Sequence, residues 1–210
     1  MTSYFRATGS LRAFWLLLIG LLASTAVGTT SAQAQSQAQS TTRTYTENPW
    51  VVIETSVGSI EIELLPKFAP KHVDNFLNLV EKAFYEGLVF HRVIPGFMIQ
   101  TGGFDADINY REHDEISVPN ESFNGLKNRR GSVAAARTDD PDSADTQFFI
   151  NVVDNPSLDA KRGEPGYTVF GRVIDGFDAV EEIELTDTHL RNGMAGVPEQ
   201  AITILSVRQR

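Results

Sequence analysis

The first regular pattern in the chain is an alternation of apolar and polar residues that begins near Trp50. An apolar run from Trp50 to Ile53 is followed by a break at 56–58. After the break, three apolar residues alternate with polar ones: Ile60, Ile62 and Leu64 with Ser59, Glu61 and Glu63. Because successive side chains of a strand point to opposite faces, this pattern predicts a β-hairpin with one buried face and one face in water.

The period changes to three and four residues between Pro70 and Lys82. The apolar residues recur at the spacing that forms one stripe on a helix: Val73, Phe76, Leu77 and Val80. Pro70 suits the first turn, where the N–H has no partner within the helix. The pattern predicts an amphipathic helix over 70–82, and a second, shorter helix is predicted from Phe177 to Ile183.

Further apolar runs are short and are separated by clusters of Gly, Pro, Asp and Asn. They lie at 89–94, 97–100, 132–136, 148–152, 168–173 and 201–207. The sequence shows no regular alternation of strands with helices and no internal repeat. Many short strands with two helices predict a mostly β fold, in which an antiparallel sheet closes on itself or forms a sandwich.

Residues 1–34 have the features of a signal peptide. Arg6 and Arg12 form a positive N-terminal region, Ala13 to Val27 is an apolar run, and 32–34 reads Ala-Gln-Ala, a small-residue cleavage site. The alternative is a single transmembrane anchor, but the apolar run is shorter than the roughly 20 residues needed to cross a bilayer. We expect cleavage after Ala34, export to the periplasm and no stable membrane insertion of the mature protein.

Residues 35–48 are polar, low in complexity and without apolar periodicity, which is typical of a flexible tether. The remainder, 49–210, is long enough for one globular domain with a sizeable core and too short for two large ones. The predicted organisation is therefore a signal peptide at 1–34, a tether at 35–48 and one domain at 49–210.

Charge and cysteine content narrow the range of functions. The formal charge of the chain is −9, but the only charges within 1–34 are Arg6 and Arg12, which leaves a net charge of −11 on the rest. Phosphate backbones and anionic lipid heads repel such an acidic domain, so we expect no nucleic-acid partner. The chain has no cysteine, which excludes disulfides, a thiolate nucleophile and cysteine-ligated metals.

The stretch 90–100 reads FHRVIPGFMIQ, two apolar strand-like runs separated by a Pro-Gly turn. Its single fixed charge is Arg92. Alternation places Arg92 on the same side as Phe90 and Ile94, so its guanidinium either lies across apolar surface or reaches a concave face lined by aromatic residues. The common alternative is an arginine whose stem packs on the core while its head reaches water.

Two further runs indicate a groove. GSVAAAR at 131–137 consists mostly of small residues, which leave room for a ligand, and QFFIN at 147–151 adds a polar-aromatic pair. Phe97, Met98 and Phe148 would form an apolar floor, while Gln100 and Gln147 would supply amide donors and acceptors. Simple core packing with alanines in tight corners also explains the apolar residues, but it explains the arginine and the glutamines poorly.

The motifs FHRVIPGFMIQ, GSVAAAR, TQFFIN, SLD and YTVFGRV, in this order, resemble the cyclophilin family of peptidyl-prolyl cis-trans isomerases. The resemblance extends from about Trp50 to Arg210, and the signal peptide makes the chain most similar to the bacterial periplasmic branch. It implies an eight-stranded antiparallel β-barrel closed by two α-helices, in agreement with the elements predicted above. It also implies an enzyme that accelerates rotation about X-Pro bonds and assists the folding of exported proteins.

The resemblance also implies the residues of the site. Arg92 matches the catalytic arginine of the family, and Gln100 is expected to hold the substrate and orient Arg92. The implied substrate-binding residues are His91, Phe97, Met98, Ala136, Gln147, Phe148, Leu158 and Tyr167. The expected partners are proline-containing segments of unfolded or partly folded polypeptides, and the reaction requires neither a metal nor an organic cofactor.

Three positions depart from the pattern of the eukaryotic cytosolic members. Ser157 replaces a tryptophan, Tyr167 replaces a histidine and Ala135 replaces a methionine. In the eukaryotic members that tryptophan supplies an indole donor and a large apolar surface to cyclosporin. We therefore expect weak cyclosporin binding with the isomerase reaction retained.

The residues support other functions less well. A hydrolase needs a nucleophile and a base, but G-x-S-x-G is absent and the four histidines are in no recognised pairing. The acidic run 139–145 raises a calcium-site alternative, yet it lacks the glycine and final glutamate of an EF-hand loop and is more typical of a solvated loop. A module that binds proline-containing segments with little isomerase activity stays open as the main alternative, although Arg92 favours catalysis.

Overall fold

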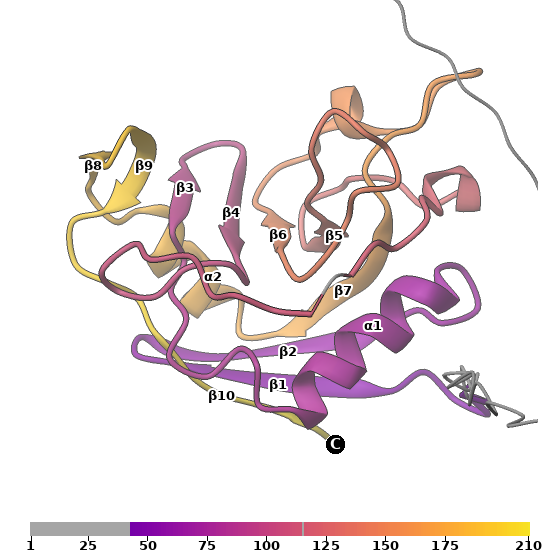
Figure 1. Cartoon of the computed structure of the whole chain (residues 1–210), viewed down its shortest axis with the longest axis horizontal. Coiled ribbons are helices and arrows are strands. Elements are labelled where there is room, and N and C mark those ends of the chain that lie inside the picture. Colours follow the sequence, from indigo (N-terminus) through magenta and orange to yellow (C-terminus); the bar gives the residue numbers. More distant parts are fainter. Residues whose placement is uncertain (1–42, 115) are drawn as a thin grey trace, which may run out of the picture. The chain divides into compact units, whose positions relative to one another are not determined.

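The computed structural model describes residues 43–114 and 116–210. Its main sheet has eight strands in the order β10-β1-β2-β7-β5-β6-β4-β3, and each pairing is antiparallel. The strands are β1 (Trp50–Thr55), β2 (Gly58–Leu64), β3 (Arg92–Ile94), β4 (Met98–Thr101), β5 (Ser132–Ala135), β6 (Phe148–Asn151), β7 (Val169–Asp175) and β10 (Ile204–Gln209). The sheet curls into a half-barrel (Figure 1), which confirms the predicted fold class.

The two edges of this sheet meet just before β3 and β10 begin. The amide of Phe90 donates to the carbonyl of Ile202 at 3.0 Å, and the amide of Ile204 donates to the carbonyl of Leu88 at 2.8 Å. Between these two bonds, Val89 pairs with Thr203 in an isolated antiparallel bridge. The half-barrel is therefore closed by a few backbone bonds between two loop segments rather than by a full strand pair.

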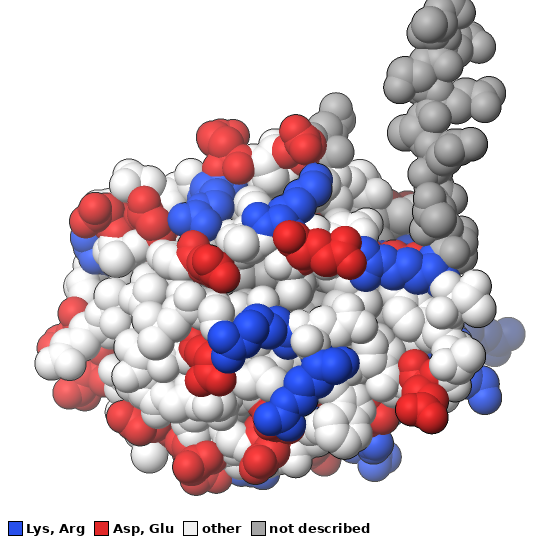
Figure 2. All heavy atoms as spheres, turned by 90° about the horizontal axis from the view of Figure 1, so that it is seen from below, with Lys and Arg blue, Asp and Glu red and all other residues white. Residues whose placement is uncertain are grey.

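β1 and β2 form the predicted hairpin with one buried and one wet face. Ile60, Ile62 and Leu64 are fully buried, whereas Glu61 and Glu63 face outward and form ion pairs with Arg210 and Arg172. Figure 2 views the molecule from the side of these strands and shows basic and acidic side chains interleaved. Exposed ion pairs each contribute little to the free energy of unfolding. The charges on this face therefore serve solubility more than stability.

The described residues contain two α-helices, α1 (Pro70–Glu81) and α2 (Phe177–Glu184), close to the predicted ranges. α1 packs against β7 and β10, and α2 packs against β2, β3 and β4. The first turn of α1 has no local side-chain cap. Instead, Glu121 accepts the amides of Lys71 at 3.2 Å and His72 at 3.1 Å, and its carboxylate also contacts Nδ1 of His72 at 2.7 Å. A distant loop thus supplies the missing cap.

A second, separate hairpin, which no apolar pattern in the sequence predicts, is made by β8 (Thr188–Arg191) and β9 (Met194–Pro198). Its turn is Asn192-Gly193, and both residues have positive φ, 51° and 80°. Asn-Gly is the dipeptide that favours such two-residue turns, but the flanking strands lack apolar alternation. The hairpin packs on β3 through β9, at one edge of the main sheet.

Two residues of the segment predicted as a tether, Arg43 and Tyr45, contact α1. Tyr45 Oη donates to Oδ1 of Asp74 at 2.6 Å, its ring packs on the core, and Arg43 forms an ion pair with Glu81 at 2.8 Å. The predicted boundary at 49 therefore lies within a segment that contacts the domain through Arg43 and Tyr45. The predicted signal peptide and residues 35–42 lie outside the described residues. Within the described part, no helix has the length and apolar character needed to span a membrane.

Apolar side chains form two clusters on opposite faces of the sheet. The larger cluster fills the interior of the half-barrel and packs against both helices. The smaller cluster lies on the outer face of β4, β5, β6 and β7 and is built from Met98, Ala134, Phe149 and Val169. This second cluster carries the candidate site.

Candidate active site

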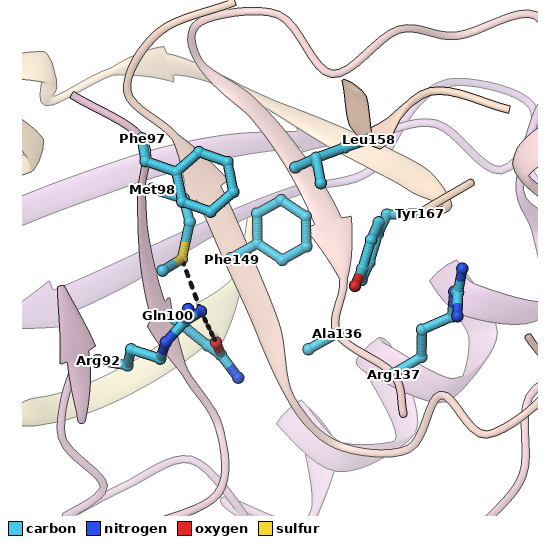
Figure 3. Close-up of a pocket in the computed structure, with 9 residues that line it drawn as sticks. All are labelled: Arg92, Phe97, Met98, Gln100, Ala136, Arg137, Phe149, Leu158 and Tyr167. Atoms are coloured by element: carbon cyan, nitrogen blue, oxygen red, sulfur yellow. Dashed lines mark hydrogen bonds between the residues drawn. The ribbon is translucent and has the colours of Figure 1, made fainter. Parts of the chain in front are cut away.

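A groove on the outer face of the sheet has the smaller cluster as its floor. The groove encloses about 280 Å³. The residues that line it (Figure 3) are Arg92, Phe97, Met98, Gln100, Ala136, Arg137, Phe149, Leu158 and Tyr167. Seven of the ten predicted site residues line the groove, and three, His91, Gln147 and Phe148, do not.

Strand alternation explains how the floor is built. On β4, Met98 and Gln100 face the groove, while Ile99 between them is fully buried in the interior. On β5, Ala134 has no solvent exposure, and its small side chain leaves space above it that a larger residue would fill. Leu158, at the end of the 3₁₀ turn η2 (Pro156–Leu158), and Tyr167, on a loop, form the wall opposite β4.

Arg92 lies at one edge of the groove, directly across β3–β4 from Gln100 in the strand register. Nη1 of Arg92 donates to Oε1 of Gln100 at 3.2 Å and contacts Sδ of Met98 at 3.9 Å (Figure 3). In the described part of the chain, no carboxylate forms an ion pair with Arg92 within 4 Å. The guanidinium is therefore held by neutral groups and keeps donors for a ligand.

Gln147 does not line the groove but contacts Gln100, which does. Nε2 of Gln100 donates to Oε1 of Gln147 at 3.1 Å, so Gln147 fixes the orientation of the amide that holds Arg92. Gly103 leaves room for the Gln147 side chain, because a Cβ at this position would lie 2.8 Å from Cδ of Gln147. The structure places Gln147 as a support for Gln100 rather than in the groove wall.

His91, one of the predicted substrate-binding residues, does not line the groove. Its side chain is buried, and its ring lies 4.7 Å from that of Phe104. Burial lowers the pKa of His91 to about 4, and the charge of Arg92 acts in the same direction, so the imidazole is neutral at pH 7. The residue points inward because its neighbour Arg92 points to the groove, and strand alternation separates the two.

Phe148 also faces the interior, which corrects a second prediction. Its ring makes edge-on contacts with Phe76 and Tyr85, at centroid distances of 5.4 and 5.6 Å. The residue that occupies the groove floor is Phe149. The period of two along β6 would have revealed this, because Phe149, and not Phe148, shares a face with Gln147.

Arg137 also lines the groove, although it is not among the predicted site residues. It follows the run of alanines on β5 and lines the side of the groove opposite Arg92. Its Cζ lies 4.7 Å from the centroid of the Tyr167 ring. No local pattern points to this contact, because Tyr167 lies on a different loop.

The acidic run 139–145 is organised by backbone contacts. The Asp140 carboxylate accepts the amide of Asp142 at 2.9 Å, and the Asp142 carboxylate accepts the amide of Asn120 at 2.7 Å. The Asp145 carboxylate accepts the amide of Gln147 at 3.1 Å. Among residues 43–114 and 116–210, no group of three or more His, Asp or Glu side chains is placed to hold a metal ion.

The fold and the groove together define a β half-barrel protein with an apolar groove and a cationic hydrogen-bond donor at its edge. The family described as cyclophilin type peptidyl-prolyl cis-trans isomerase/CLD matches residues 50–209. The chain belongs to this family and is a cyclophilin-type peptidyl-prolyl cis-trans isomerase.

Individual relatives agree with this assignment. A peptidyl-prolyl cis-trans isomerase of Acinetobacter baylyi is 47% identical over 161 residues, which cover 77% of this chain and 85% of that protein. Peptidyl-prolyl cis-trans isomerase B of Escherichia coli is 46% identical over 162 residues, which cover 75% of this chain and 97% of that protein. A crystal structure of a cyclophilin-type isomerase of Cryptosporidium parvum has a TM-score of 0.65 at 27% identity and covers 78% of this chain and 98% of that chain.

Proposed function

We propose that Arg92 is the catalytic residue of this isomerase and that Gln100 orients it. The observation that carries the proposal is the 3.2 Å bond from Nη1 of Arg92 to Oε1 of Gln100 at the edge of an apolar groove. A planar peptide bond resists rotation with a barrier of about 18–20 kcal/mol. When the bond twists, the prolyl nitrogen loses its conjugation and becomes a better acceptor. A donor aimed at that nitrogen binds the twisted state better than either planar isomer and lowers the barrier.

The arginine alone is insufficient for an efficient enzyme. Unaided rotation about an X-Pro bond takes roughly 10–100 s, so a millisecond reaction needs roughly 10⁴-fold acceleration, about 5.5 kcal/mol. One charge-assisted hydrogen bond contributes about 1.5–3 kcal/mol. The apolar residues Phe97, Met98, Phe149 and Leu158 supply the remainder by seating the proline ring and excluding water from the amide. Rotation breaks no covalent bond, so these steps use only residues of the groove.

Substitution of Arg92 tests the mechanism. Arg92→Ala should lower kcat/KM for a prolyl peptide at least about tenfold, and Arg92→Lys should rescue poorly because an ammonium lacks the planar fork of the guanidinium. Arg208→Ala, on the outer face of β10, is the matched control and should leave activity unchanged. A protease-coupled peptide assay measures the rates, and circular dichroism checks that each variant is folded. Wild-type activity in Arg92→Ala would overturn the mechanism, and peptide binding by an inactive wild type would favour a binding module instead.

The substrates that we propose are proline-containing segments of unfolded or partly folded exported proteins. A second Cryptosporidium parvum cyclophilin structure, determined in the presence of the dipeptide Ala-Pro, supports prolyl peptides as ligands (TM-score 0.62, 28% identity, 75% of this chain and 96% of that chain). The features of residues 1–34 support export to the periplasm. N-terminal sequencing of the protein recovered from the cell envelope should give Gln35 as the first residue. Uncut chain in the membrane fraction would support the anchor alternative.

We also propose that cyclosporin binds weakly. Ser157 lies exposed in the 3₁₀ turn η2 (Pro156–Leu158), beside Leu158 at the groove rim. It offers neither an indole donor nor a large apolar surface. Ser157→Trp should therefore raise the affinity for the drug about ten- to a hundredfold while changing turnover less. Titration of cyclosporin against both proteins in one peptide assay decides the matter, and tight inhibition of the wild type would contradict the proposal.

A further inference from the structure

The side of the groove opposite Arg92 is a stack of three side chains. The guanidinium of Arg137 lies over the Tyr167 ring, with Cζ 4.7 Å from the ring centroid. Phe149 meets the same ring edge-on, with a centroid distance of 5.6 Å and an interplanar angle of 77°. Figure 3 shows Tyr167 between Arg137 and the cavity. Phe149 on β6 and Arg137 on the loop that follows β5 therefore restrict the orientation of the ring from two sides.

The guanidinium of Arg137 is itself fixed by backbone carbonyls. Its Nη1 donates to Thr138 at 2.8 Å, its Nη2 to Pro165 at 3.2 Å, and its Nε to Gly166 at 3.4 Å. No carboxylate pairs with it within 4 Å in the part of the chain that the structure describes. Arg137 thus ties the segment that follows β5 to the segment that leads into Tyr167, and the planar fork of the side chain is what allows these contacts at once.

The Tyr167 hydroxyl is available to a ligand. Its oxygen points toward the cavity, near Ala136 (Figure 3). The structure gives this hydroxyl no hydrogen-bond partner among residues 43–114 and 116–210. The backbone of Tyr167 is fixed as well, because its amide donates to the carbonyl of Leu158 at 2.9 Å.

We propose that Arg137 is a positioning residue of the isomerase, which holds the Tyr167 ring so that its hydroxyl hydrogen-bonds the backbone of a bound prolyl peptide. The inference rests on the proposed location of the active site in this groove. Tyr167 lies across the groove from Arg92, away from the group that acts on the twisted bond. Its contact is therefore made equally with planar and twisted peptide, and uniform binding of this kind changes KM rather than kcat.

Steady-state kinetics of the full mature chain tests the proposal. Arg137→Gln should raise KM for a prolyl peptide about three- to tenfold with little change in kcat, the size expected for one lost stacking or hydrogen-bonding interaction. Arg137→Lys should stay close to Arg137→Gln, since lysine keeps the charge but not the contacts with the carbonyls. Tyr167→Phe keeps the stack and loses the hydroxyl, so it should raise KM to a similar extent. Arg162→Gln is the matched control, because Arg162 is exposed on the loop that leads to Tyr167 and outside the groove.

A double-mutant cycle separates positioning from a direct role. If Arg137 acts through the ring, Arg137→Gln should have almost no effect on KM in a Tyr167→Ala background. If the effects of Arg137→Gln and Tyr167→Ala on KM multiply in the double variant, the proposal is wrong. A fall in kcat with KM unchanged in Arg137→Gln would also overturn it. Partial unfolding lowers the amount of active enzyme and leaves KM unaltered, so it cannot imitate the expected result. If Arg92→Ala is fully active, the groove assignment itself is wrong. Wild-type KM in Arg137→Gln, with Arg92→Ala inactive, contradicts only the present inference.

Discussion

The two faces of β6 place adjacent phenylalanines in different environments. Phe148 is 2% exposed and packs among the aromatic rings of the half-barrel interior, whereas Phe149 is 4% exposed and forms the floor of the groove against Tyr167. By exposure alone the two residues are equivalent. The difference between them is the direction that the strand period assigns to each side chain.

This comparison shows that burial does not separate structural from functional residues in this protein. Phe149 lies at the bottom of the groove, so a residue that lines the groove is almost as inaccessible to solvent as a residue of the core. What separates them is the cluster to which each belongs. The useful measurement is therefore the balance between lost stability and lost activity when one side chain is removed.

Truncation of the two phenylalanines should give the largest effects and the clearest contrast. Phe148→Ala should lower the free energy of unfolding by about 3–5 kcal/mol, because it opens a cavity among Phe76 and Tyr85. Phe149→Ala should cost less stability, since its ring borders open space, and should lower kcat/KM at least about tenfold by removing the apolar seat for proline. Urea unfolding and the peptide assay measure the two quantities. The reverse pattern would show that Phe148 belongs to the site after all.

Sequence patterns predicted the elements whose stabilising contacts are local. The alternation at Ile60, Ile62 and Leu64 and the stripe on α1 follow directly from backbone geometry, and both are confirmed. The Asn192-Gly193 turn was equally local, but without apolar alternation beside it the hairpin was missed. The spacing of two residues from Gln147 points to Phe149 as the groove residue. The prediction instead chose Phe148, which directly follows Gln147 in the sequence.

The contacts that could not be predicted join residues far apart in the chain. Glu121 caps α1 and bonds His72 across 49 residues, and Arg137 stacks on Tyr167 from another loop. Each residue alone reads as an ordinary surface charge. Only the closed fold selects one partner among many, so local periodicity carries no signal for such pairs.

The next effect concerns His91, which lies on the interior side although it adjoins the Gln147 amide. Its ordinary pKa of 6.5 falls to about 4 in the fold because of burial, and nearby polar groups of Val89 and Gln147 only partly oppose this shift. Above pH 6.5 both folded and unfolded states hold a neutral ring. As the pH falls from 6.5 to 4 only the unfolded chain takes up the proton, so stability should decrease by up to about 3 kcal/mol.

A pH series of urea midpoints tests this expectation. His91→Gln cannot titrate, so its stability should vary less between pH 4 and 6.5, whatever its absolute level. An unchanged slope in His91→Gln would mean that another group titrates in this range.

A smaller effect is expected at Glu121. Burial acts to raise its pKa, but the His72 ring and the amides of His72 and Lys71 outweigh it, and the pKa lies below the usual range. The charged carboxylate therefore contributes stability above the ordinary pKa of about 4.3, and that contribution is lost as the pH falls through the folded value. Glu121→Gln should cost about 1.5–3 kcal/mol at pH 7 and show less acid loss below pH 4. Because Glu121 serves α1, kcat and KM of the folded variant should match the wild type. A raised KM in Glu121→Gln would instead indicate that the loop carrying Glu121 contributes to the wall of the groove.

The smallest expected effect concerns residues 43–48, where sequence and structure assign different roles. The Tyr45 hydroxyl donates to Asp74 at 2.6 Å, and burial together with the Asp74 carboxylate raises the pKa of the phenol. Tyr45→Phe keeps the ring on the core and removes one hydrogen bond to a charged acceptor, so it should cost about 1–2 kcal/mol without altering kcat or KM. Arg43→Gln, which removes only an exposed ion pair with Glu81, is the matched comparison and should cost less than about 1 kcal/mol. Urea unfolding and hydrogen exchange of the α1 amides measure both variants. If Tyr45→Phe is indistinguishable from the wild type in both measurements, residues 43–48 behave as the tether that their composition predicts, and the domain begins at 49.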